Sequence, residues 1–173
     1  MKRRTGWDEL ANALSSSALL AVAQHWDQAR SNRLLPTWAD LSSSALAPHF
    51  KLLWGFNFDP KANEYTGLIA GKHVSEWLGA NFWGARLQDI HPPHVVNDAR
   101  RFFDRIMAGP AIGRCSGRLF TMSGRAITGE RIALPLAPDG GHPGGILGAT
   151  DYEYLPVSGE VELIHENVEW FAL

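Results

Sequence analysis

The sequence predicts an α+β domain in which several short helices and one longer helix cover a five-stranded antiparallel sheet, behind an N-terminal helical extension. Stretches that alternate apolar and polar residues fall into two groups, first a pair of strands and later three more. Between the groups lies a run of short helical patterns that ends in one strongly amphipathic helix. An antiparallel sheet must bury at least one face, and the central helices are the available cover.

The N-terminal segment, residues 7–32, has the pattern of one amphipathic helix that Asn32 can close. Leu19, Leu20 and Trp26 lie off its apolar stripe, so a second side of the helix is apolar as well. Two apolar sides indicate packing on the domain or on a second copy, and we expect a homodimer through this helix. The stripe consists of Trp7, Ala11, Leu14, Ala18, Val22 and Ala29.

A hairpin follows a linker. Residues 33–50 contain two prolines and a serine run, which predict a linker with a short helical turn. LLWGFNF, residues 52–58, alternates with aromatic residues on one side, as a half-buried strand does. DPKANE supplies turn residues, and EYTGLIA, residues 64–70, returns as the second strand.

The central helices come next. HVSEWLG (73–79) and GARLQDI (84–90) each predict one or two helical turns bounded by glycine. HVVNDARRFFDRIMAG (94–109) predicts the longer helix, which begins after two prolines and stops at Gly109–Pro110. Its apolar stripe consists of Val95, Val96, Ala99, Phe102, Phe103, Ile106 and Met107.

The last third of the chain is rich in strand patterns. Residues 111–122 and 125–137 flank Ser123–Gly124, a plausible hairpin turn, and residues 146–156 predict a further strand. VELIHENVEWFAL (161–173) fits a helix and an extended strand equally well. We therefore divide the chain into an N-terminal helical extension (1–32), a domain (33–156) and a C-terminal tail (157–173) that is helix or strand.

Composition excludes several classes of protein. Sixteen basic and eighteen acidic side chains give a formal charge of −2, without the basic excess of nucleic-acid proteins. Cys115 is the only cysteine, which excludes an intramolecular disulfide and a CxxC zinc site. Residues 7–14 are too polar for a secretion signal, and residues 18–23 are too short to span a bilayer. These features predict a cytoplasmic protein that binds neither nucleic acid nor membrane.

Three segments resemble the PAS domain superfamily, and more specifically a family of compact stand-alone bacterial PAS-like proteins. They are LLPTWADL (34–41), the stretch from LLWGFNF to LQDI (52–90) and ERIALPLAPDGGHPGGILGATDYEY (130–154). The resemblance implies a PAS-like sheet with a small-molecule pocket between it and the helices. The matching landmarks are Gly71, Leu78–Gly79, Gly84 and Pro135–Leu136.

Aromatic residues are the pocket candidates. EWLGANFWG crowds large aromatic rings and glycines into one connection, and glycines let the backbone approach a ligand. The alternative is that these rings only fill the space between sheet and helices. If the pocket exists, we expect a small apolar or aromatic ligand. The candidates are Trp54, Phe56, Trp77, Phe82, Trp83, Phe102, Phe103 and Cys115.

Metal and cofactor signals are weak. His91 and His94 have the spacing of a helical metal pair, but the prolines between them spoil the geometry, so we predict a helix cap or a surface role. A single histidine such as His73 does not by itself indicate haem. The PAS superfamily that the chain resembles has a flavin-binding branch, whose reactive cysteine lies in an asparagine-cysteine-arginine run. Cys115 lies between Arg114 and Ser116 instead. The cofactor, if any, stays unidentified, and haem and flavin are disfavoured.

The predicted function is that of a stand-alone PAS-like sensory or regulatory domain without catalysis, which binds a small ligand or a downstream signalling protein. One alternative is a small cone-shaped isomerase or dehydratase with His91, Asp89 or Asp151 as base. Another is a ligand-free protein-interaction module. An apolar cavity favours the sensor, a buried titratable group in the cavity favours the enzyme, and a fully packed core favours the interaction module.

Overall fold

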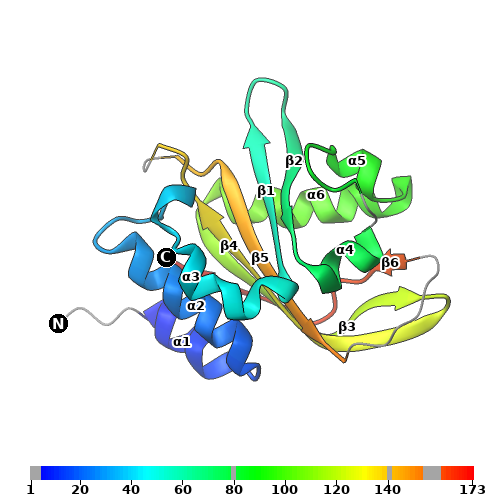
Figure 1. Ribbon diagram of the computed structural model, residues 1–173, viewed down its shortest axis with the longest axis horizontal. Helices are drawn as coiled ribbons and strands as arrows, with labels where there is room; N and C mark the ends of the chain where they lie inside the picture. Colours follow the sequence, from blue (N-terminus) through cyan, green and yellow to red (C-terminus); the bar gives the residue numbers. More distant parts are fainter. Residues whose placement is uncertain (1–4, 79–80, 140–141, 154–160) are drawn as a thin grey trace.

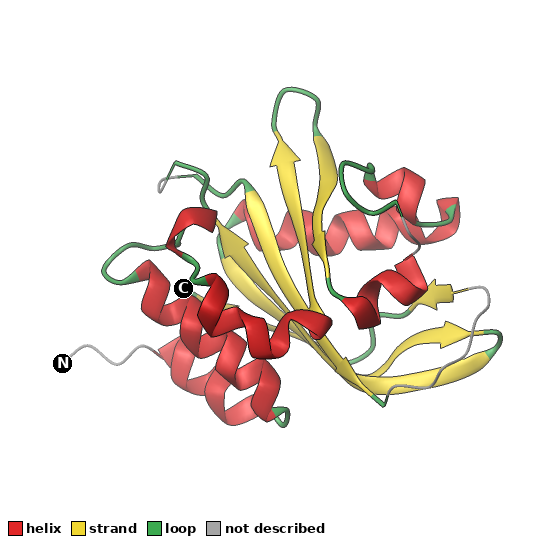
Figure 2. Ribbon diagram, viewed as in Figure 1, coloured by secondary structure: helices red, strands yellow, loops and turns green. Residues whose placement is uncertain are grey.

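The computed structural model describes residues 5–78, 81–139, 142–153 and 161–173. Within these residues seven strands form one antiparallel sheet, whose first five members lie in the order β2-β1-β5-β4-β3. The α+β prediction is therefore confirmed, with all five predicted strands in one sheet (Figure 2). These strands are β1 (Leu53–Asp59), β2 (Glu64–Ala70), β3 (Ala111–Met122), β4 (Arg125–Leu136) and β5 (Gly145–Tyr152).

The C-terminal tail adds two strands that were not predicted as such. β6 (Val161–Leu163) and β7 (Val168–Ala172) both pair with the outer edge of β3, one at each end of it. An exposed edge leaves backbone donors and acceptors unpaired, so a partner along β3 satisfies them. The local apolar pattern of this tail is compatible with a helix as well as a strand. Its long-range pairing with β3 selects the strand conformation.

Helices cover both faces of the sheet (Figure 1). One face carries α1, α2, α3 and two short 3-10 helices, and the other carries α4, α5 and α6. The helices are α1 (Thr5–Ala13), α2 (Ser17–Arg30), η1 (Trp38–Asp40), α3 (Ser43–Leu46), η2 (Ala47–Leu52), α4 (Lys72–Leu78), α5 (Leu87–Ile90) and α6 (Pro93–Ala108).

The predicted single helix over residues 7–32 is wrong in one respect, because it is broken into α1 and α2. The first helix ends at Ala13, and Ser16 caps the second: its hydroxyl accepts a hydrogen bond from the Leu19 amide and donates one to Asp151. A serine in this position competes with helix continuation and favours a new N-cap. The break also rotates the buried face, so that Leu19 and Trp26 are fully buried.

The N-terminal helices share one hydrophobic cluster with the sheet. Leu10, Leu19 and Trp26 pack with Ile132 and Leu134, which alternate along β4 with residues of the opposite face. The two apolar sides that predicted a homodimer are therefore largely buried against the domain itself. In packing terms the extension and the domain form one unit.

Trp26 offers a test of this packing. Its ring is fully buried, and its indole N–H donates to the Pro135 carbonyl at 2.9 Å. Trp26→Phe removes the donor and leaves a gap, so we expect the free energy of unfolding to fall by about 1–3 kcal/mol in urea titrations. Trp83→Phe is the matched control, because Trp83 is 80% exposed. Equal losses in the two variants would contradict the packing.

Candidate ligand-binding site

A small cavity lies between the sheet and α6. Its volume is about 30 Å³, which is room for two or three water-sized groups. Residues from β1, β4 and α6, from the connection before α6 and from the C-terminal tail enclose it. They are Trp54, Phe56, His91, Ala99, Phe102, Phe103, Arg131, Leu163 and His165.

Aromatic rings form one wall, and small residues in the sheet make room for them. The Trp54 ring lies flat on Gly148 of β5, where an added Cβ would come within 2.0 Å of it. Its indole N–H donates to the Thr150 hydroxyl at 2.9 Å, and the ring stacks on Phe103 with centroids 5.8 Å apart. Phe102 covers Gly113 of β3 in the same way. This wall is rigid and apolar.

Arg131 brings a positive charge to this otherwise largely apolar cavity. It points from β4 to the α6 side and is only 3% exposed. Its Nε donates to the Thr150 hydroxyl at 3.3 Å, while Nη2 is buried without a hydrogen-bond partner. Within the described ranges no carboxylate forms a salt bridge with it. Burial lowers the pKa of this guanidinium, with the neighbouring Cys115 acting in the opposite direction.

Two histidines complete the site. Burial, and next the charge of Arg131, lower the pKa of His91 and of His165 to about 4, so both imidazoles are neutral near pH 7. The His165 ring packs on Phe102 with centroids 4.9 Å apart. His91 is the partly exposed C-cap residue of α5, where its backbone N–H donates to the Leu87 carbonyl, and its side chain also lines the cavity, which the sequence did not indicate. His94 does lie at the surface, 3.6 Å from Glu162.

The wall that carries His165 belongs to the segment between β6 and β7. Ile164 N–H donates to the Leu119 carbonyl at 2.9 Å, and Glu166 pairs with Arg118 at 3.0 Å. Leu163, His165 and Phe102 line the cavity and also an open surface groove of about 500 Å³ beside α6. These three side chains therefore lie between the cavity and the open groove.

Four of the eight predicted pocket residues line this cavity: Trp54, Phe56, Phe102 and Phe103. Phe82 is buried but packs behind Phe56, with ring centroids 5.0 Å apart. Cys115 is buried in the sheet, where it is the register partner of Arg131, and burial raises the pKa of its thiol. Neither Phe82 nor Cys115 lines the cavity.

Trp83 and Trp77 complete the comparison. The segment before α5 runs along β2, with hydrogen bonds from Gly67 to Ala85 and from Gly84 to Gly67, both 2.8 Å. This arrangement directs Phe82 inward over Gly67 and leaves Trp83 in solvent, so Trp83 is not a wall of the cavity. The Trp77 side chain lies outside the described residues.

Five lining residues were not among the predicted pocket residues: His91, Ala99, Arg131, Leu163 and His165. The sequence does contain a signal for Arg131. In ERIALPL, Ile132 and Leu134 point to one face of the strand and Arg131 points to the other, and both faces of this central strand are buried. A charged residue at such a position is unusual and indicates a specific role. His165 carried no comparable signal, because its position depends on how the tail pairs with β3.

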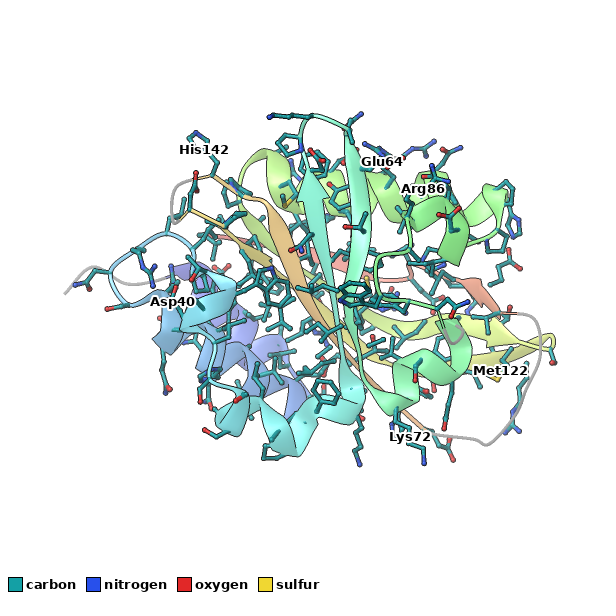
Figure 3. All side chains as sticks on the ribbon, turned by 45° about the horizontal axis from the view of Figure 1, so that its top comes forward. Asp40, Glu64, Lys72, Arg86, Met122 and His142 are labelled. Carbon is teal, nitrogen blue, oxygen red and sulfur yellow. The ribbon has the colours of Figure 1, made fainter. Side chains whose placement is uncertain are left out.

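Of the three proposed catalytic bases only His91 reaches the cavity. Asp89 is exposed and pairs with Arg86 at 2.9 Å, and Asp151 accepts a hydrogen bond from Ser16 near the start of α2. Figure 3 shows Arg86 beside Glu64, whose carboxylate is 3.7 Å away, at the outer side of the hairpin. Asp89 therefore stabilises the connection between β2 and α5 through its ion pair with Arg86.

The histidines are expected to make the protein less stable in mild acid. Their folded pKa of about 4 lies below the ordinary 6.5, so between these values the unfolded chain binds more protons. Stability is complete above pH 6.5 and falls towards pH 4, by about 2 kcal/mol per histidine at pH 5. Arg131 faces both rings and Asp98 acts on His165. Urea unfolding at pH 7 and pH 5 measures the loss.

The matched variant carries both His91→Gln and His165→Gln. Because glutamine does not titrate, its loss of stability between pH 7 and pH 5 should be smaller by several kcal/mol. Parallel losses in the wild type and in this variant would show that other groups, and not these imidazoles, control the acid response.

A family model described as PAS domain matches residues 14–151, which is most of the chain and includes α2. A search of curated proteins and a search of solved structures each returned no match. None of the described helices has the length and apolar character needed to cross a membrane.

Proposed function

The chain belongs to the PAS domain family, and from this we propose that it is a sensory or regulatory module. It binds a small ligand in the cavity between the sheet and α6, carries out no catalysis, and passes the signal to a partner protein. One observation carries the proposal: two walls of the cavity, Leu163 and His165, belong to the C-terminal tail. Occupation of the cavity and the position of the tail are thereby linked.

The tail is suited to report occupation. β6 pairs with β3 through three residues and β7 through five, and the segment between them leaves the sheet to reach the cavity. A ligand that contacts His165 has a higher affinity for the docked tail than for a displaced one. This difference in affinity shifts the population of the two states, which is what a downstream protein senses.

Ala99→Leu tests whether the cavity is the site. Ala99 is buried on α6 and lines the cavity, so a larger side chain fills the space that a ligand needs. Small molecules that raise the melting temperature of the wild type should have little effect on this variant. Binding should also slow hydrogen exchange at residues 161–172 in the wild type. Ligands that stabilise both proteins equally, or that leave exchange in the tail unchanged, would refute the proposal.

The proposal includes a homodimer through the surface of the N-terminal helices. Deleting residues 1–32 would remove Leu10, Leu19, Val22, Ala23 and Trp26 from the hydrophobic cluster that they share with the sheet, so a change of mass in that variant would not isolate an oligomer contact. The remaining exposed apolar side chains near these helices include Leu34 and Phe50. Sedimentation of the wild type and of a Leu34→Glu variant measures whether this surface joins two copies.

A further inference from the structure

We propose that the cavity binds a small oxyanion, of carboxylate or nitrate type and about the size of formate or acetate, with the guanidinium of Arg131 as its counter-ion. This inference rests on the proposed function, since it takes the cavity to be the ligand site, and it adds the charge and size of the ligand. It replaces the expectation of an apolar ligand that the aromatic residues alone had favoured.

The first support is the cost of burying Arg131. An arginine stays protonated in proteins, and a buried cation costs several kcal/mol unless an anion and hydrogen bonds compensate it. The described part of the chain supplies one neutral hydroxyl, that of Thr150, at 3.3 Å. Nη2, with two N–H donors, has no partner. An anion in the cavity would satisfy both the charge and these donors.

The second support is how the chain treats its other buried arginines. Arg114, on the neighbouring strand β3, contacts Glu130 at 2.6 Å and also Glu169. Arg30, at the end of α2, contacts Asp27 at 2.6 Å. In each case a carboxylate neutralises the guanidinium inside the protein. Arg131 is more buried than either, and among the described residues it has no such carboxylate.

The third support is the remainder of the lining. His91 and His165 line the same space and are neutral near pH 7, so each imidazole has one N–H that can donate, and none of the described lining residues is acidic. Polar side chains from three separate parts of the chain therefore meet at the cavity, and none of them carries a negative charge. Most of the lining is apolar, and an apolar environment strengthens a charge-assisted hydrogen bond.

The volume limits the ligand. About 30 Å³ holds two or three water-sized groups, which fits formate, nitrate or acetate and leaves no room for a large organic anion. A planar oxyanion also matches the planar donor array of a guanidinium, which a spherical ion does not.

The test is an NMR titration of the full-length protein with sodium formate, acetate or nitrate, following the imidazole signals of His91 and His165 and the melting temperature. Ionic strength is held constant with sodium chloride, whose spherical anion does not match the planar donor array of a guanidinium. Acetamide is the neutral counterpart of acetate. Arg131→Met removes the charge, Arg131→Lys keeps it without the planar donors, and Arg101→Gln is the control. Arg101 is 79% exposed and lines the outer groove.

We expect at least one anion to shift both histidine signals saturably and to raise the melting temperature in the wild type and in Arg101→Gln. Arg131→Met should weaken this binding at least about tenfold, and Arg131→Lys should weaken it less. Equal binding of acetamide and acetate would overturn the inference while leaving a ligand site in place. Undiminished binding by both Arg131 variants, or no response to any of the anions, would overturn it as well.

Discussion

Replacing Glu130 by glutamine is expected to lower the free energy of unfolding by about 3 kcal/mol. The Glu130 carboxylate is buried between β4 and the start of α2, where it contacts Arg114 at 2.6 Å. It also accepts hydrogen bonds from the backbone amides of Ser15 and Ser16, at 3.1 and 2.8 Å. Glutamine keeps the shape but leaves the Arg114 charge undercompensated and weakens the anchor at the N-terminus of α2.

Glu169→Gln is the matched control for this prediction. Glu169 contacts the same guanidinium, but its side chain is 49% exposed, so its loss should cost no more than about 1 kcal/mol. Urea unfolding at pH 7 measures both variants. A cost for Glu130→Gln no greater than that of the control would show that burial of the carboxylate does not govern the strength of this pair.

Local periodicity was sufficient for the parts of the fold whose contacts are local. The β1–β2 hairpin, α6 and the β3–β4 hairpin form where the pattern predicts them, because turn residues and one apolar face are enough to specify each. The tail was undecidable, since Val161 and Val168 satisfy both a helical and an extended period. The unpaired edge of β3, far away in sequence, makes the choice.

The candidate site divides in the same way. Trp54, Phe56, Phe102 and Phe103 were found because apolar faces of regular elements point at one another across a layer. Trp83 was misplaced because a connection has no period that separates inward from outward residues. Histidines in connections share this difficulty, and His91 and His165 reach the cavity only through the tertiary course of the chain.

The variant Arg131→Met is expected to be more stable than the wild type by about 1–4 kcal/mol in the absence of a small anion. Methionine is unbranched and apolar, fits an aromatic environment and removes a buried charge that no described carboxylate compensates. Thr150, which loses a hydrogen bond at 3.3 Å, still receives one from Trp54 at 2.9 Å. The direction is opposite to that expected for Glu130→Gln, although both residues are buried neighbours on β4.

Urea unfolding of the wild type and of Arg131→Met at increasing concentrations of acetate or nitrate distinguishes the reasons for this difference. A ligand that binds only the folded wild type stabilises it by about 2.7 kcal/mol at one hundred times its dissociation constant. The advantage of the variant should therefore shrink, and then reverse, as the anion concentration rises. A variant that is less stable than the wild type without any added anion would mean that Arg131 is compensated within the protein. Groups of the protein itself would then offset the cost of burying this guanidinium, and no bound anion would be needed for that.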